Sequence, residues 1–243
     1  MARALLLRGM LAGVLAGLLA AGFAALFGEP PLELAIGLET ALDHATGHAA
    51  EPELVSRPVQ RTLGLLTACV AGGAALGGIV ALVFALAHHR VGHFSPRMLA
   101  LLLAGGGFIA AALVPQLKYP ANPPSIGEAT TIGLRTAVYF ELIAVSLAAL
   151  VLAVLLARWL LAHIGGWHAS LVAILAFVCI VTAAQFVLPD INEVPDNFPA
   201  TVLWRFRVAA LGTQLVLWSA LGVIFGALAD RALSAQSVAN SSA

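Results

Sequence analysis

Six long apolar runs divide this chain and leave it few ways to fold. The runs are Leu5–Phe27, Leu63–Ala87, Met98–Leu117, Ala137–Ala157, Ala169–Leu188 and Val208–Ala229. Each holds about 20 residues or more, and at about 1.5 Å per residue such a helix crosses roughly 30 Å of hydrocarbon. The runs predict an all-α fold, a polytopic bundle of six transmembrane helices.

Composition excludes a soluble protein. The chain is 61% hydrophobic and only 10% charged, whereas a soluble domain carries about 25% charged residues. The formal net charge is zero, so there is no basic patch that would favour nucleic acid. We expect a single transmembrane domain over residues 1–233 and a short disordered tail over 234–243.

The first run resembles a secretory signal because Arg3 and Arg8 precede it and small residues lie near Ala20–Gly22. Its length of about 23 residues exceeds the 7 to 15 of a signal-peptide core. We expect a retained helix. The alternative, a cleaved signal, would leave five helices.

The carboxylates gather on one side of the predicted membrane. Six crossings place the first, third and fifth loops together, and these loops hold ten of the twelve acids. The ten are Glu29, Glu33, Glu39, Asp43, Glu51, Glu53, Glu128, Asp190, Glu193 and Asp196. An acidic face on a membrane protein favours a cation as the species that it handles.

Basic residues suggest the orientation. The short segments on the opposite side carry arginines close to the helix ends, as cytoplasmic segments do. We therefore expect both termini in the cytoplasm and the acidic loops outside. The outer ends of the second, fourth and sixth runs also carry arginines, which we expect to pair with the outer carboxylates. They are Arg57, Arg61, Arg135, Arg205 and Arg207.

Small residues recur at helical spacing within the runs. Gly9, Gly13 and Gly17 form a GxxxGxxxG pattern, and Gly222 and Gly226 repeat the spacing in the last run. Such patterns let helix backbones approach closely in lipid, where little hydrophobic force drives association. We expect these faces to pack against other helices.

The best candidate metal ligands lie in the first loop. His44 and His48 are four residues apart, with Asp43 and Glu51 beside them. If Pro31–Thr46 is helical, both imidazoles face the same way. Neutral imidazole with carboxylate suits Zn, Ni, Co or Cu(II). The alternative is that these are ordinary loop histidines.

Further candidates lie at and beyond the membrane. Glu141 is an acidic residue that lies inside an apolar run. An ionisable residue at membrane depth is a functional candidate by default. It could also form a structural ion pair with Arg135, Arg205 or Arg207. On the other side, a second histidine cluster could release a metal or simply lie at the polar interface. It consists of His88, His89 and His93.

No catalytic signature is present. The chain has no HExxH, GxSxG, P-loop or dinucleotide-binding sequence. We therefore expect neither an enzyme nor a bound cofactor, and the chain holds no nucleotide domain for an ATP-driven pump.

Three long segments resemble the CbtA family of bacterial membrane proteins, which are predicted cobalt transporter subunits. They are residues 56–61 (SRPVQR), 118–136 (KYPANPPSIGEATTIGLRT) and 188–218, which contains VPDNFPATVLWRFRVAALGTQLVLW. The resemblance covers nearly the whole chain. It implies cobalt uptake for cobalamin and a small one-helix partner protein with a histidine-rich end. The family is usually described with five helices, and it supplies no metal ligands.

Together these observations predict a multi-pass protein of the bacterial inner membrane that carries a divalent transition-metal ion inward. Cobalt is the expected ion, and nickel is the alternative that the residues leave open. The rival interpretation is a membrane scaffold or assembly protein that transports nothing.

Overall fold

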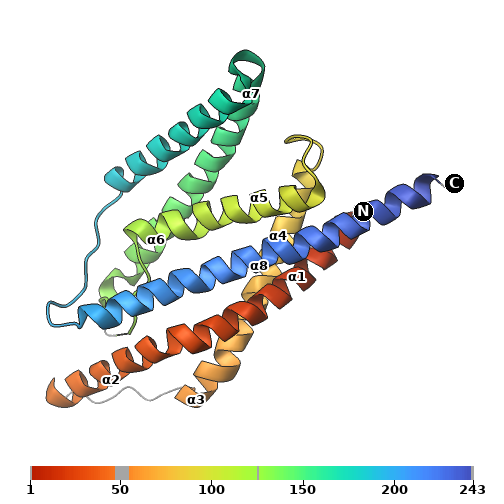
Figure 1. The fold of residues 1–243 in the computed structure, drawn as a ribbon. Coiled ribbons are helices and arrows are strands. Elements are labelled where there is room, and N and C mark those ends of the chain that lie inside the picture. The colour runs from red at the N-terminus through yellow and green to blue at the C-terminus, as the bar shows by residue number, and fades with distance from the viewer. Residues whose placement is uncertain (1, 47–54, 125, 242–243) are drawn as a thin grey trace. The chain divides into compact units, whose positions relative to one another are not determined.

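The computed structural model describes residues 2–46, 55–124 and 126–241. Helix makes up 86% of the structure, and the described residues contain no strand. Five elements are long and apolar enough to cross a membrane: Arg3–Leu42, Arg57–Ala87, Pro96–Lys118, Ala129–Val187 and Ala200–Ala235. The predicted all-α, multi-pass class is therefore confirmed (Figure 1).

The first three elements each contain a π-helical segment of five residues. The first consists of α1 (Ala2–Phe23), η1 (Ala24–Gly28) and α2 (Glu29–Thr46). The second consists of α3 (Arg57–Val59), η2 (Gln60–Gly64) and α4 (Leu65–Ala87). The third consists of α5 (Pro96–Phe108), η3 (Ile109–Leu113) and α6 (Val114–Lys118). A π segment widens one helical turn, so it changes which face of the helix points inward.

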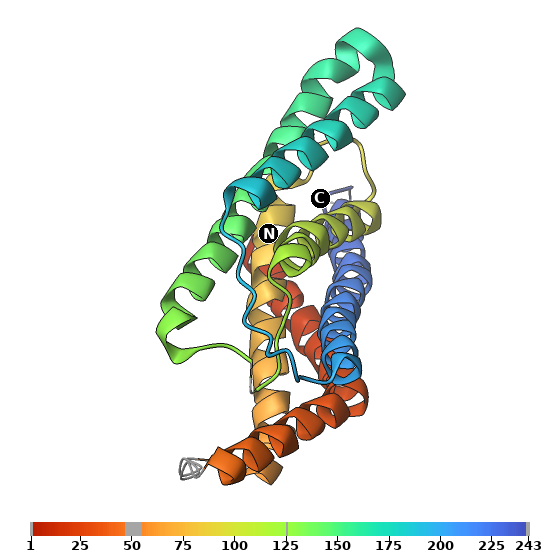
Figure 2. The same ribbon diagram turned by 90° about the vertical axis from the view of Figure 1, so that its left-hand side faces the viewer.

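The structure has five helical elements of membrane length, one fewer than the six helices predicted. After η4 (Ala129–Thr131), α7 (Ile132–Val187) joins the fourth and fifth apolar runs through the predicted loop. Within it Gly165 departs from helical dihedrals, with φ 75° and ψ 164°. The two arms of α7 fold back on each other (Figures 1 and 2). A straight helix of 59 residues would measure about 90 Å, three times the hydrocarbon thickness, so the reversal lets each arm match a bilayer.

The last element, α8, runs from Ala200 to Ser241. The single transmembrane domain over residues 1–233 and the disordered tail over 234–243 stay predictions.

The chain forms two compact units. Unit one comprises Met1–Gly105, Asn122–Ser125 and Pro199–Ala243. Unit two comprises Gly106–Ala121 and Ile126–Phe198. Each unit has its own packing and is described by itself.

In unit one α1 packs against α4 with opposite chain direction. Gly9 lies opposite Gly77, and Gly13 lies opposite Gly73. A Cβ added at Gly17 would overlap the carbonyl oxygen of Cys69. The predicted role of the glycine pattern in close helix packing is therefore confirmed.

A similar contact joins α5 and α8. A Cβ added at Gly222 would meet the Cβ of Ala104 at 2.8 Å, and one added at Gly226 would meet the Cβ of Ala100 at 3.3 Å. Nearby, the buried rings of Phe84 and Phe225 meet edge to face, with centroids 5.3 Å apart. These contacts form the core of unit one.

Unit two has a smaller core between α6 and the two arms of α7. Val114, Leu142, Ala149 and Val181 are buried together. The buried hydroxyl of Ser146 donates to the backbone carbonyl of Ala110, which joins α7 to η3. A buried polar group satisfied in this way fixes how the two helices pack.

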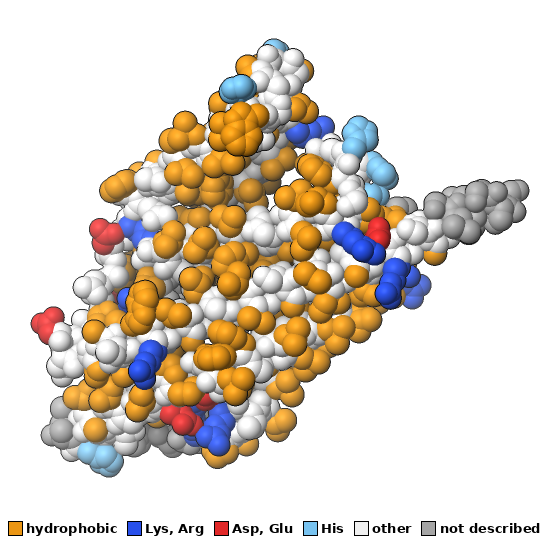
Figure 3. Space-filling model, viewed as in Figure 1, with side chains coloured by type: hydrophobic (Ala, Val, Ile, Leu, Met, Phe, Trp, Pro, Cys, Tyr) orange, Lys and Arg blue, Asp and Glu red, His pale blue; other side chains and the backbone are white. Residues whose placement is uncertain are grey.

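Much of the helical surface is apolar. Figure 3 shows hydrophobic side chains spread over the visible face. Phe186 and Val187 are 86% and 83% exposed, and Leu26 is 72% exposed. Apolar surface on this scale is rare in soluble monomers. It fits helices that contact lipid.

Candidate functional site

Two ion pairs join α2 to the start of the second element, at the end of unit one away from the chain termini. Arg57 Nη2 donates to Glu29 Oε2 at 2.5 Å, and Arg61 Nη1 donates to Glu33 Oε1 at 2.8 Å. The predicted pairing of these arginines with outer carboxylates is confirmed. Both carboxylates are thus neutralised locally and would have to leave their arginines to bind another cation.

The two pairs differ in exposure. The Arg57 and Glu29 side chains are 23% and 15% exposed, whereas those of Arg61 and Glu33 are 52% and 48% exposed. Solvent screens the second pair more strongly. The first pair therefore holds α2 against the second element more firmly.

The remaining unit-one arginines depart from the prediction. Arg207 donates to the side-chain oxygen of Asn122 at 2.7 Å, so its partner is an amide and not a carboxylate. Arg205 has no ion pair with any residue that the structure describes. The expected pairing is therefore wrong for Arg207, whose partner is Asn122, and for Arg205 it stays a prediction.

In unit two the segment after α7 is fastened to the end of α6. Lys118 Nζ lies 2.5 Å from Asp190 Oδ1, and the Tyr119 hydroxyl donates to the Pro189 carbonyl at 2.7 Å. Burial raises the pKa of Tyr119; Lys118 opposes this shift, while Asp190 and Glu141 add to it. Tyr119 therefore keeps its proton and its hydrogen bond at physiological pH.

Glu193 holds the same segment at a second point. Its carboxylate accepts the backbone N–H of Glu128 at 2.9 Å, and Arg135 Nε lies 3.5 Å away. A hydrogen bond from Thr131 lowers the pKa of Glu193 most, followed by the Glu128 N–H and the charge of Arg135. The predicted pairing of Arg135 with an outer carboxylate is confirmed.

Glu141 lies on an exposed face of α7, within the apolar run Ala137–Ala157. The predicted alternative of an ion pair with Arg135 is wrong, because Arg135 contacts Glu193 and donates to the Glu128 carbonyl at 3.0 Å. Glu141 forms no ion pair with any described residue of unit two. Its role in an ion pathway stays a prediction.

The first-loop candidates fall partly outside the described residues. The helix expected over Pro31–Thr46 is confirmed as part of α2. Asp43 and His44 lie in its last turn, and His44 is exposed. His48 and Glu51 lie outside the described residues, so the metal pair stays a prediction.

The second histidine cluster lies just beyond α4. The His88 ring stacks on Phe84 with centroids 5.2 Å apart, and the His89 ring centroid is 3.8 Å from that of His88. Burial lowers the pKa of His88, and the neighbouring His89 lowers it further. Neutral imidazoles are the form that binds metals, but His93 is exposed and does not complete a set.

Across residues 2–46, 55–124 and 126–241, no three His, Cys, Asp or Glu side chains lie together in a way that could hold a metal ion. Sequence reasoning also missed Lys118 and Tyr119 as partners of the segment after α7, and Asn122 as the partner of Arg207. Lys118 and Tyr119 could have been recognised, because a lysine and a tyrosine directly after an apolar run suit a membrane interface.

Comparison with known protein families identifies a match. A family model described as "Probable cobalt transporter subunit (CbtA)" matches residues 2–230. No curated protein and no solved structure matches the chain. The match covers the first four membrane-length elements and reaches residue 230 of the fifth. The chain therefore belongs to the CbtA family of probable cobalt transporter subunits.

Proposed function

We propose that this chain is the membrane subunit that carries Co²⁺ inward across a bacterial inner membrane to supply cobalamin synthesis. The observation that carries the proposal is the family match over residues 2–230, together with five helices of membrane length. Unit one supports the proposed orientation, because both termini lie at the same end of it (Figures 1 and 2). In our proposal this end is cytoplasmic.

The proposed route uses three groups of ligands. The first-loop group collects the ion outside, and it consists of Asp43, His44, His48 and Glu51. Glu141 is the first ligand at membrane depth. His88, His89 and His93 receive the ion inside.

The contacts of these residues support the route. Glu141 has no cationic partner among the described residues of unit two, so its charge is available to a metal ion. The adjacent His88 and His89 rings are held in place by Phe84. The arginine-bound carboxylates Glu29 and Glu33 act as structural ties and not as ligands.

The family description names a subunit, which implies other subunits. We propose that the partner is a small membrane protein with one helix and a histidine-rich end. Such an end would raise the local concentration of metal near the transport route, because several imidazoles compete well for Co²⁺.

The test is uptake of radioactive cobalt into cells that lack their own cobalt importers. Cells expressing this chain, with and without a histidine-rich partner, should show saturable uptake above empty cells. A His44→Ala/His48→Ala double variant should lose most of it, whereas His163→Ala/His168→Ala, a pair on α7 outside the route, should not. Unchanged uptake in the first double variant would remove the first loop from the route.

One observation favours the rival function, a scaffold that transports nothing. Several outer carboxylates are occupied by arginine or lysine, and the described residues bring no three metal ligands together. If the protein reaches the membrane and cobalt uptake stays at background with and without the partner, the scaffold explains the chain better.

A further inference from the structure

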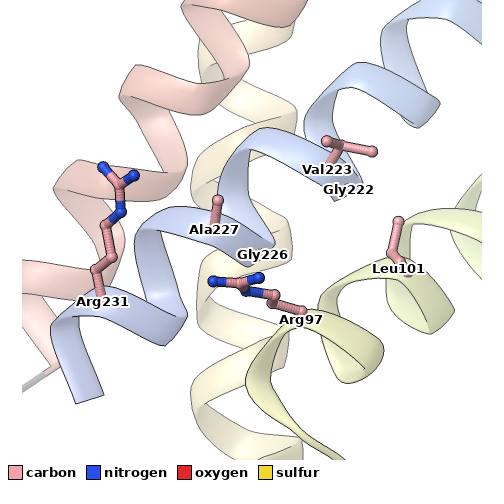
Figure 4. Close-up of a pocket in the computed structure, with 7 residues that line it drawn as sticks. All are labelled: Arg97, Leu101, Gly222, Val223, Gly226, Ala227 and Arg231. Carbon is pink, nitrogen blue, oxygen red and sulfur yellow. The ribbon is translucent and has the colours of Figure 1, made fainter. Parts of the chain in front are cut away.

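A groove opens between α5 and α8, at the end of unit one that holds the chain termini (Figure 4). Its volume is about 340 Å³. Its apolar walls are Leu101 of α5 with Val223, Gly226 and Ala227 of α8. Arg97 extends across α8 beside Gly226, and Arg231 lies one turn beyond Ala227. The groove is therefore apolar along its length and cationic at one end.

The charges at this end do not cancel. Arg97 Nε lies 2.8 Å from Asp230 Oδ2, and the Arg97 side chain remains 64% exposed. Arg231 is exposed and has no ion pair with any described residue. Two guanidinium groups and one carboxylate leave one positive charge, which complements one phosphate group. Guanidinium groups bind phosphate through paired N–H donors.

The walls select the rest of the ligand. Both helices belong to elements of membrane length. The Val223 side chain is 61% exposed, so the groove opens to the outside of the helical bundle. A small soluble anion would gain nothing from these apolar walls, whereas a hydrocarbon chain would.

We propose that this groove binds an anionic glycerophospholipid. One acyl chain lies along Leu101, Val223 and Ala227, and the phosphate lies at the end of the groove that Arg97 and Arg231 line. Basic pockets between transmembrane helices bind anionic headgroups in this way. The site is distinct from the proposed cobalt route, and its test does not depend on transport.

The experiment is native mass spectrometry of the full chain in detergent, titrated with phosphatidylglycerol or with phosphatidylcholine. Phosphatidylglycerol should bind more tightly. Arg97→Gln and Arg231→Gln should each weaken its binding about fivefold, the effect expected of one arginine near an anionic headgroup. Arg90→Gln is the matched control, because Arg90 is exposed near the same end and does not line the groove.

A second variant tests the acyl-chain wall. Ala227→Phe keeps both arginines and fills the groove, so it should also weaken binding of phosphatidylglycerol. Melting temperatures in phosphatidylcholine alone should match the wild type, which separates lost binding from lost folding. Equal binding of the two lipids, or full binding by the double variant Arg97→Gln/Arg231→Gln, overturns the proposal. The proposal is also overturned if replacing these arginines leaves lipid binding unchanged and instead releases a polypeptide that co-purifies with the chain.

Discussion

Gly13 of α1 and Gly73 of α4 meet backbone to backbone. A Cβ added to either residue would overlap the carbonyl oxygen of the other. Gly9 and Gly77 repeat this relationship one turn away. At such separations Cα–H groups reach carbonyl oxygens and van der Waals contact is extensive. The glycines therefore set both the distance and the register between the two helices.

A larger side chain at this contact should separate the helices. We expect Gly13→Leu to lower the free energy of unfolding by about 3 kcal/mol or more, at or above the usual range for overpacking, because only backbone atoms face it. Gly72→Leu is the matched control, since a Cβ at Gly72 meets nothing within 4 Å. Thermal unfolding in detergent measures both. Equal melting temperatures for the two variants would contradict this packing.

The ion pairs of Glu29 and Glu33 should contribute unequally to stability. We expect Glu29→Gln to cost about 1 to 3 kcal/mol, because it leaves the largely buried Arg57 without its charged partner. Glu33→Gln should cost less than about 1 kcal/mol, because that pair is half exposed. Chemical unfolding at low and moderate salt measures both costs. The prediction fails if the Glu33 variant is the less stable of the two.

Glu193 should make the attachment of the segment after α7 depend on pH. Its pKa lies below the ordinary value of 4.5 in the folded chain, so its contribution to stability is complete above about pH 4.5. The contribution disappears as the pH falls through the lower pKa of the folded state. The protection factors for backbone hydrogen exchange over residues 188–198, taken relative to the intrinsic exchange rate at each pH, should therefore fall in acid.

Two variants isolate this effect. Glu193→Ala should show fast exchange in this segment already at neutral pH, because the Glu128 N–H and Arg135 lose their common partner. Asp196→Asn, in the same segment, should exchange like the wild type. Slow exchange at neutral pH in Glu193→Ala would show that other contacts hold the segment.

The sequence was most informative where the membrane itself dictates the pattern. Apolar runs of membrane length and glycines four residues apart have few physical meanings in lipid, so the helical class and the close packing of the α1 glycine face were predictable, although its partner α4 was not. Arg57, Arg61 and Arg135 needed anionic partners near the membrane, so their pairing with carboxylates was predictable too.

The misses have different causes. Residues 158–168 contain polar side chains that suggest a loop, yet helix continues on both sides of Gly165 because one glycine is enough to reverse the chain. The partner of Arg207 is Asn122, 85 residues away. No local pattern indicates such a pairing, because it depends on how distant loops pack.

Glu141 should matter for transport and little for folding. Because it is exposed and has no ion pair with the described residues of unit two, Glu141→Gln should leave the melting temperature within about 1 °C of the wild type. Cobalt uptake should fall about tenfold, as expected for a lost ion-pathway carboxylate. Glu128→Gln, outside the proposed route, is the control. Normal uptake by Glu141→Gln would exclude it from the pathway.

Gly165 and Gly166 should respond oppositely to alanine. Gly165 has φ 75° and ψ 164°, a region essentially restricted to glycine, so Gly165→Ala should cost about 1 to 3 kcal/mol. Gly166 is helical, and a Cβ there meets Leu161 at an ordinary 3.5 Å. Gly166→Ala should therefore raise stability by up to about 1 kcal/mol. Thermal unfolding and protease cleavage near residue 165 measure both changes. If Gly165→Ala is as stable as Gly166→Ala, the chain does not reverse at Gly165.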